Sequence, residues 1–266
     1  MGRNTPLVLY LSHGGGPLPL LGDEGHLEMV YTLEYLAAKL SKPSAILLVS
    51  AHWEEDVPTI TSGPNPELIY DYYGFPAEAY SIEYPCAGET ELAGRVHQLL
   101  DQHGIEARLD GQRGFDHGLF VPLKIMYPEA DIPCVQLSLV TDLDPLEHLR
   151  IGSALASLDQ KDLLVIGSGF SFHNMRAFFS PETEETRKMN KSFERWLIDT
   201  CANSEISEEE RWKRLAGWEE APFARYCHPR EEHLLPLHVC YGIAQRLCRE
   251  YFELKILGKK ASFYLW

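Results

Sequence analysis

The chain has 266 residues, of which 45% are hydrophobic, and its formal net charge at pH 7 is −15. This length and composition suffice to bury the core of one domain of ordinary size. The negative charge, with no run of lysines or arginines, argues against nucleic-acid binding because it repels phosphate backbones. The apolar runs are far shorter than the roughly 20 residues of a membrane-spanning helix, so we expect no membrane association.

The sequence enters a strand-like run close to its first residue, so we expect no signal peptide. Its six cysteines are scattered, with none in a Cys-x-x-Cys spacing. In a chain of this length, that pattern predicts reduced core thiols rather than disulfides or a zinc ribbon. We therefore expect a cytoplasmic protein.

Short apolar runs alternate with helical patterns along most of the chain. Strands are predicted at residues 6–11, 45–49, 134–139 and 163–166, and helices at residues 26–40, 89–103, 145–157 and about 180–201. A long segment without helical periodicity, residues 54–87, follows the second strand. The alternation predicts a single α/β domain over residues 1–266, with a mixed, mostly parallel central sheet flanked by helices on both faces.

The last third of the sequence is predicted to be mainly helical. Ser207, with Glu210 three residues later, fits a capping box before a helix at residues 211–218. Pro229 is predicted to open a further helix that runs to about residue 250. The chain then fits a closing hairpin around Gly258.

Four segments place a histidine just after an apolar run or near a helix start. His13, His52 and His173 follow three of the predicted strands, and His233 lies in the first turns of the helix that Pro229 opens. In open parallel α/β sheets, the carboxyl ends of the strands share one edge, and ligands bind outside that edge. These histidines are therefore expected at one place, in a pattern that indicates a metal site.

Three glycines follow His13, so the backbone can approach a ligand closely there. A triple glycine can also cradle phosphate, but neither Gly-Lys-Ser/Thr nor Gly-x-Gly-x-x-Gly accompanies it. Small residues and Trp53 surround His52, which leaves room for its ring and for an apolar shell that tunes a metal. Taken singly, each histidine could instead be an ordinary turn or core residue.

Asp116 and Gly118 flank His117, with another glycine three residues before it. This pattern predicts an exposed ring on a tight loop, suited to acid–base work near neutral pH, or a loop histidine without a role. Asp116 is expected to orient another group or to stay solvated. His173, which follows the glycine-rich end of a strand, is expected to be a ligand or a proton carrier.

Only one of His228 and His233 needs to face the site. Leucines surround His233, so it is predicted to point inward, whereas His228 precedes a proline and is predicted to lie in a loop. Glu231 and Glu232 are predicted to be solvated carboxylates of a first helical turn. The remaining histidines are predicted to be surface or packing residues: His26, His97, His103, His148 and His238.

Residues 70–84 carry six aromatic side chains and no lysine or arginine. An irregular loop of this length is unusual unless it covers something. The segment is either a wall for a flat aromatic substrate or simple packing over the sheet.

The segments that carry these residues match a known pattern in order. They are Ser12-His13-Gly14, Ser50-Ala51-His52-Trp53, Tyr73-Gly74-Phe75-Pro76, Phe115-Asp116-His117-Gly118, residues 126–133 with 136–138, residues 167–174 and residues 232–237. Together they resemble the class III extradiol ring-cleavage dioxygenases (LigB-like), in particular the branch that includes the 4,5-DOPA dioxygenases. The likeness covers nearly the whole chain.

The resemblance implies a mononuclear non-heme metal held by His13, His52 and His233, with His173 as a fourth ligand or a substrate-facing base. It also makes His117 and His173 the candidate catalytic residues. In better-known members of the superfamily, the third ligand is a carboxylate. An all-histidine set carries one less negative charge and suits Zn(II) as well as Fe(II). The expected cofactor is one divalent metal, Fe(II) for ring cleavage or Zn(II) as bound.

The implied activity is extradiol cleavage of a catechol, with a DOPA-like catechol as one candidate, and insertion of both atoms of O2. The expected partners are this small aromatic substrate and O2, and a homo-oligomer is compatible with the sequence. Two alternatives stay open: a zinc-dependent hydrolase, and a non-enzymatic binding protein on the same fold. Turnover of esters or amides without oxygen would indicate the first, and absence of tight metal binding the second.

Overall fold

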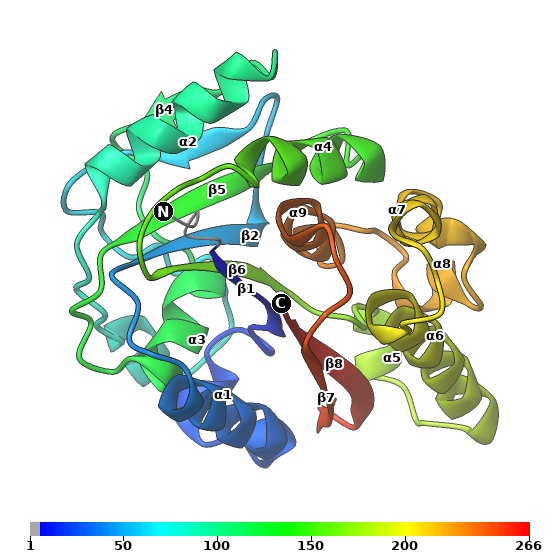
Figure 1. Ribbon diagram of the computed structural model, residues 1–266. Helices are drawn as coiled ribbons and strands as arrows, with labels where there is room; N and C mark the ends of the chain where they lie inside the picture. The colour runs from blue at the N-terminus through cyan, green and yellow to red at the C-terminus, as the bar shows by residue number, and fades with distance from the viewer. Residues whose placement is uncertain (1–5) are drawn as a thin grey trace.

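The computed structural model describes residues 6–266 and has one eight-stranded sheet at its centre (Figure 1). The strands are β1 (Leu7–Ser12), β2 (Ala45–Glu55), β3 (Thr59–Thr61), β4 (Arg108–Asp110), β5 (Cys134–Val140), β6 (Leu163–Gly169), β7 (Glu250–Ile256) and β8 (Lys259–Leu265). Their order across the sheet is β4-β3-β5-β2-β6-β1-β8-β7. Strands β5, β2, β6 and β1 run parallel, whereas β3 is antiparallel to β5 and β8 is antiparallel to β1. The predicted mixed sheet is confirmed.

Helices cover both faces of this sheet, as predicted. The longer ones are α1 (Leu27–Lys39), α2 (Thr90–Gln102), α3 (His117–Met126), α4 (Pro145–Leu155), α6 (Glu184–Ala202), α7 (Glu208–Ala216) and α9 (Leu235–Ala244). The short ones are α5 (Met175–Phe178), α8 (Ala224–Cys227), η1 (Leu18–Leu21), η2 (Glu24–His26), η3 (Ala77–Ser81) and η4 (Trp218–Glu220). Helices α1 and α3 pack together on one face, α4 and α9 pack together on the other, and α6 packs on β8 (Figure 1).

The central strands are apolar along their length because both of their faces are covered. Every residue of β5 and β6 is buried. The edge strand β7 instead alternates exposed residues with half-buried or buried ones, as a strand with one solvated face does. The hydrophobic core therefore lies in two layers, one on each side of the central strands.

Three elements differ from their prediction. Helix α3 was not predicted, and His117, expected on a tight loop between two glycines, is its first residue. The helix predicted from residue 229 to residue 250 is wrong: α9 is shorter and ends where Gln245 adopts a left-handed conformation with a φ of 49°, before β7 begins. The helix predicted from residue 180 begins later, where Thr183 caps α6. By contrast, Ser207 caps α7 as predicted, accepting a hydrogen bond from the Glu210 amide.

All six cysteines are free and buried, as predicted. Among residues 6–266, no helix has both the length and the apolar character that crossing a bilayer requires.

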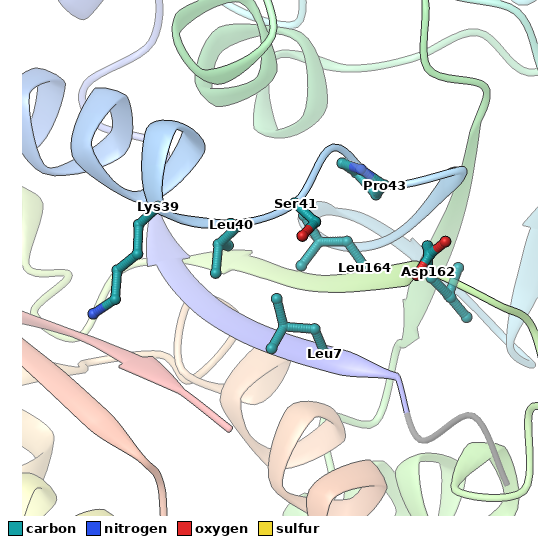
Figure 2. A pocket seen from close by; sticks show the side chains of 8 residues that line it. Leu7, Lys39, Leu40, Ser41, Pro43, Asp162 and Leu164 are labelled. Carbon is teal, nitrogen blue, oxygen red and sulfur yellow. The ribbon is translucent and has the colours of Figure 1, made fainter. Parts of the chain in front are cut away.

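A hollow of about 390 Å³ lies at the amino ends of the parallel strands (Figure 2). Leu7 and Leu163, the first residues of β1 and β6, line it together with Pro43. His13 and His173 lie past the other ends of the same two strands. The hollow and the histidines are therefore on opposite edges of the sheet, and the carboxyl edge is where such sheets bind ligands.

Candidate metal centre

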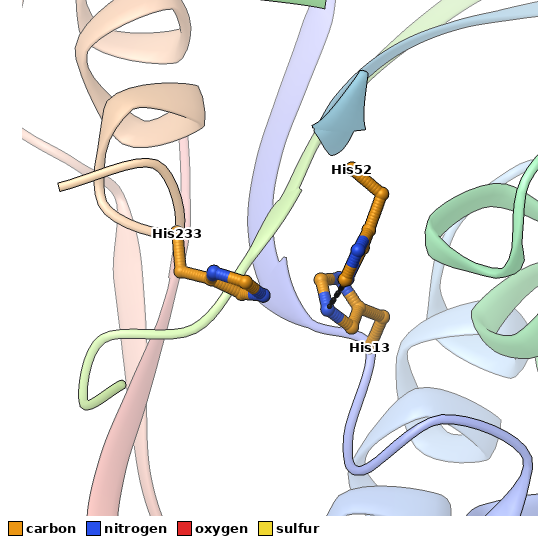
Figure 3. Close-up of side chains that lie close together, drawn as sticks. All are labelled: His13, His52 and His233. Atoms are coloured by element: carbon orange, nitrogen blue, oxygen red, sulfur yellow. Dashed lines mark hydrogen bonds between the residues drawn. The ribbon is translucent and has the colours of Figure 1, made fainter. Parts of the chain in front are cut away.

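Three imidazole rings meet past the carboxyl ends of the central strands (Figure 3). His13 follows β1, His52 lies in the last part of β2, and His233 comes shortly before α9. One nitrogen of each ring lies within 4.8 Å of the other two, and the Nε2 atoms of His13 and His52 are 2.9 Å apart. The fold thus brings together three histidines that are far apart in the sequence.

A bulge in β2 accompanies the position of His52. The pairing of β2 with β5 changes register between Val49 and Glu54, so the regular strand pairing is interrupted around His52. Such a bulge bends a strand and re-aims its side chains. The backbone N–H of His52 donates to Ser50 Oγ at 3.2 Å, which anchors the bulged segment.

A glycine turn after β1 holds His13. Gly14 has a φ of +84°, and a Cβ there would lie 2.9 Å from the ring of His26, so glycine is required. His26 accepts a hydrogen bond at Nε2 from the Gly15 amide at 2.9 Å, while its Nδ1 donates to Asp23 at 2.7 Å. His26, predicted to be a surface or packing residue, is a buried residue that fixes the turn carrying His13.

A second glycine lets the backbone of His233 approach the sheet. A Cβ on Gly169, the last residue of β6, would lie only 2.1 Å from the carbonyl oxygen of His233. That oxygen accepts hydrogen bonds from the Phe170 amide at 2.9 Å and from the Tyr10 hydroxyl at 2.9 Å. The backbone position of His233 is therefore determined by strands β1 and β6.

Ser168 determines which nitrogen of His13 carries the proton. Its hydroxyl donates to the carbonyl of Gly118 at 2.5 Å. The serine oxygen must then accept from Nδ1 of His13, which is 3.0 Å away. Since Nδ1 holds the proton, Nε2 of His13 presents a lone pair toward the cluster.

The other two imidazoles have carboxylates behind them in the same way. Glu232 accepts a hydrogen bond from Nδ1 of His233 at 2.8 Å, and a carboxylate oxygen of Asp71 lies 3.6 Å from Nδ1 of His52. The Nε2 atom of His233 is thereby left free, as in His13, which is the usual arrangement behind metal-binding histidines. Three imidazole nitrogens that converge in this way fit a shared divalent cation and suit zinc or iron.

The Glu232 carboxylate serves two histidines at once. Its Oε1 atom lies 2.8 Å from Nδ1 of His233 and 3.0 Å from Nδ1 of His173. Glu232 is only 8% exposed, so the prediction of a solvated carboxylate is wrong for this residue. Burial opposes its ionisation, but the hydrogen bond from His173 lowers the pKa of Glu232. The neighbouring Glu231 instead pairs with Arg225 at 2.5 Å, on the outer side.

A second carboxylate–histidine pair lies on the other side of the cluster. Asp71 Oδ1 accepts from Nδ1 of His117 at 2.8 Å and from its backbone amide at 3.0 Å. The ring centroid of His117 is 4.0 Å from that of His52. His117 is only 4% exposed and begins α3, so the predicted exposed loop ring is wrong. Burial opposes ionisation of Asp71, but its hydrogen bonds with His117 lower the pKa of Asp71 to about 2.

The three clustered imidazoles are held neutral. Burial, followed by the proximity of the other histidines, keeps the pKa of His13 and His233 well below the usual range. The pKa of His52 is lowered for the same reasons, against a smaller opposing influence of Asp71. Neutral imidazole is the form that binds a metal, so the site is prepared for one at neutral pH.

The other histidines lie elsewhere. Nε2 of His228 donates to the carbonyl of Ser171 at 2.8 Å, and its ring is buried between Phe193 and Trp218. His148 and His238 are buried and bonded to backbone groups. The remaining two, His97 and His103, are on or just after α2. Their surface or packing role is thus confirmed.

Asp116, expected either to orient another group or to stay solvated, is completely buried. It accepts a hydrogen bond from Ser50 Oγ at 2.8 Å and another from the amide of Gln136. Burial raises the pKa of Asp116. The residue therefore ties the start of α3 to strands β2 and β5, next to the histidine cluster.

The aromatic segment packs against the histidine cluster. Tyr72 is buried and its ring meets the edge of His117, with 5.6 Å between the centroids. Its hydroxyl donates to the carbonyl of Ala79 at 2.6 Å, which closes the loop on itself. Tyr73, by contrast, is 92% exposed. Asp71 belongs to this segment and was missed from the sequence, because no motif singles out an acidic residue among so many aromatic ones.

A family model described as the catalytic LigB subunit of aromatic ring-opening dioxygenase matches residues 25–264. The chain is 38% identical over 281 residues to dioxygenase tasH of Hapsidospora irregularis, with 97% of this chain and 85% of that protein covered. It is 39% identical to the 4,5-DOPA dioxygenase extradiol of Portulaca grandiflora, with 88% of this chain and 84% of that protein covered.

A bacterial relative and a solved structure agree with this. The 4,5-DOPA dioxygenase extradiol of Escherichia coli K12 is 33% identical, with 88% of this chain and 84% of that protein covered. The crystal structure of an uncharacterized protein from Escherichia coli K12 superposes with a TM-score of 0.77 at 26% sequence identity, covering 98% of this chain and 99% of that one.

Proposed function

Because the chain belongs to the LigB family of aromatic ring-opening dioxygenases, we propose that it opens the ring of a catechol by extradiol cleavage, with His13, His52 and His233 as the metal ligands. The observation that carries this proposal is the set of three converging imidazoles, two of them hydrogen-bonded at Nδ1 and the third with a carboxylate 3.6 Å from Nδ1. Such a donor set holds one divalent ion and leaves positions open for reactants.

In this proposal, a divalent iron supplies, when bound, the redox chemistry of ring opening with O2 and the positive charge that favours deprotonation of the catechol. The protein supplies the orientation. His13 and His52 come from β1 and β2, the two strands that flank β6. His233 is fixed by its carbonyl contacts with Phe170 and Tyr10. Held in this way, the three nitrogens need little rearrangement when the substrate arrives.

His173 and His117 are the proposed proton carriers. Each has its Nδ1 atom against a carboxylate oxygen, Glu232 at 3.0 Å for His173 and Asp71 at 2.8 Å for His117. The opposite nitrogen of each ring, Nε2, can accept a proton from a catechol hydroxyl, and the carboxylate behind the ring then stabilises the imidazolium. The two pairs neighbour different ligands, His117 beside His52 and His173 beside His233, so one can act as base and the other as acid.

The proposed substrate class is a catechol, and a DOPA-like catechol is the first candidate because several relatives are named for 4,5-DOPA. Tyr72 supports an aromatic substrate, since its ring lies against His117 at the edge of the cluster. We also propose a cytoplasmic location, because six free buried thiols fit a reducing compartment.

The experiment is anaerobic reconstitution of the metal-free protein with Fe(II), followed by oxygen uptake and visible absorbance with catechols that include DOPA. We expect one oxygen consumed per ring opened and a coloured semialdehyde product. The H13A variant should bind no metal and consume no oxygen. Tight Fe(II) binding without oxygen uptake on any catechol would contradict ring cleavage. The Zn(II) form, which lacks the redox step, is the matched control and should cleave no catechol.

A further inference from the structure

An ion pair joins the two segments that carry His52 and His233. Arg230 donates from Nη1 and Nη2 to the two carboxylate oxygens of Glu54, both at 2.6 Å. Glu54 lies two residues after His52, and Arg230 lies three residues before His233. The pair therefore connects the end of β2 to the turn before α9.

We propose that Arg230 binds the carboxylate of an anionic side chain on the ring substrate, which displaces Glu54 from the guanidinium. This inference rests on the proposed function, because it assigns a specificity determinant to the same site. The chemical class that fits is a catechol bearing one carboxylate on a short flexible chain.

The position of Arg230 supports this assignment. Its Nη1 atom is 3.6 Å from Oε2 of Glu232, and the other oxygen of Glu232 lies against the rings of His173 and His233. One carboxylate group thus separates the guanidinium from the histidine cluster. In this proposal, the ring is held at the cluster and a side chain of two or three carbons reaches Arg230.

The Arg230 guanidinium is also accessible to a substrate carboxylate. Its side chain is 52% exposed, whereas Arg113, which contacts buried Asp116, is 21% exposed and stacks over Trp53. An exposed ion pair contributes little to stability, so displacing Glu54 from the guanidinium costs little free energy. The planar fork of arginine binds any carboxylate with two parallel hydrogen bonds, and this explains why a substrate can take the place of Glu54.

Glu232 favours replacement of Glu54 by a substrate carboxylate at Arg230 over a state in which Arg230 has lost Glu54 and gained no other anion. Its Oε2 atom is buried without a hydrogen-bond partner, and the Arg230 guanidinium is the positive charge beside it. Arg230 without an anion partner on its other side would be drawn to this oxygen. A substrate carboxylate keeps the guanidinium between two negative groups, as Glu54 does in the free protein.

The experiment compares two ligands that differ only in charge, 3-(3,4-dihydroxyphenyl)propionate and its primary amide. Binding to the Fe(II) protein is measured without oxygen, by calorimetry, and turnover is measured separately by oxygen uptake. In R230Q, we expect the ratio of carboxylate to amide affinity to fall by about 10- to 100-fold, as for loss of a charge-assisted hydrogen bond. The loss should appear in KM more than in kcat.

E54Q should change the ratio of carboxylate to amide affinity in the opposite direction. Removing the competing carboxylate leaves Arg230 free, so we expect the carboxylate to bind more tightly while the amide changes little. R225Q is the matched control, because Arg225 also pairs with a glutamate of the same turn, Glu231, but on the outer side. It should leave the ratio of the two ligands unchanged.

If the Arg230–Glu54 pair only holds β2 to the turn before α9, the change in the two ligand affinities should be a different one. R230Q and E54Q would then weaken both ligands to the same extent, and this outcome would overturn the proposal while leaving ring cleavage intact. A wild-type protein that binds both ligands equally would overturn it too. If neither catechol binds the Fe(II) protein, the proposed function itself fails, and the inference fails with it.

Discussion

His173 and His233 lie face to face, with 3.4 Å between ring centroids and 18° between ring planes, and both direct Nδ1 at the same carboxylate oxygen of Glu232. One carboxylate thus orients a proposed metal ligand and a proposed proton carrier together. Because the two rings share a partner, a change at either one alters the hydrogen bonding of the other. Metal binding and proton transfer are therefore expected to respond together to substitutions at Glu232.

The first prediction concerns this shared carboxylate. E232Q keeps the size of the side chain but removes its charge. The Nδ1–H groups of His173 and His233 then face a neutral amide instead of a carboxylate. We expect metal affinity to fall about 10- to 100-fold, as for other groups behind metal ligands. Competition with a chromogenic chelator measures it. E231Q is the control, since Glu231 faces Arg225 instead, and equal affinities in the two variants would contradict the prediction.

The second prediction concerns the tautomer of His13. S168A removes the acceptor for His13 Nδ1 and the donor to Gly118, both buried. We expect a loss of about 1–3 kcal/mol in the free energy of unfolding of the metal-free protein, together with weaker metal binding. In the control S138A, the Thr59 amide loses its acceptor away from the cluster. That variant should lose stability but bind the metal normally.

The third prediction separates the proton carriers from the ligands. In H117Q, we expect one metal per chain and a kcat reduced by about 10²- to 10⁴-fold, the usual contribution of a general acid or base. Metal content by elemental analysis and single-turnover oxygen uptake test both parts. If the H117Q protein binds no metal, His117 is instead a metal ligand. If its kcat is unchanged, His117 takes no part in the chemistry.

The fourth prediction concerns backbone packing at the cluster. G169A puts a Cβ 2.1 Å from the His233 carbonyl oxygen, which two hydrogen bonds hold in place. We expect a loss of about 1–3 kcal/mol in stability, as in other overpacked cores, and weaker metal binding. In the control G94A, a Cβ on α2 meets nothing within 4 Å. That substitution should stabilise the protein slightly, because alanine favours a helix. Urea unfolding of both variants measures the difference.

The fifth prediction concerns pH and a carboxyl group outside the cluster. Burial raises the pKa of Glu194 from 4.5 to about 7, although Ser262 donates to it. Between these pH values, the folded chain keeps a proton that the unfolded chain releases, so stability falls as pH rises. Relative to E194Q, which does not titrate, the metal-free wild type should lose up to about 3 kcal/mol between pH 4.5 and 7. Denaturant unfolding at pH 5 and pH 8 tests the sign.

The central strands and the helices between them could be predicted because each has a clear pattern of apolar residues. Buried parallel strands such as β6 are continuous apolar runs, and the helices between them have regular apolar spacing. Elements without these signals were missed: β4 has only three residues, two of them exposed, and α3 contains a proline. The end of α9 was misplaced because Gln245, rather than a glycine, adopts the left-handed conformation there.

The candidate site was only partly readable. Histidines at strand ends are conspicuous, because apolar runs lead directly into them. Asp71 and Glu232 were not recognised, since an acidic residue in a loop or first helical turn is usually solvated. Their positions at the cluster depend on tertiary contacts with His117 and His173, which local sequence does not encode.

The spacing of the three clustered histidines along the chain also affects how the protein unfolds. His13 lies near one end of the chain and His233 near the other, so an ion held by both would act as a reversible cross-link between the termini of the domain. An unfolded chain cannot present these nitrogens together, so the ion binds the folded form alone. Stability then rises with the free metal concentration, by about 2.7 kcal/mol when that concentration is 100 times the Kd. The melting temperature of this protein would thus report how much metal its surroundings supply.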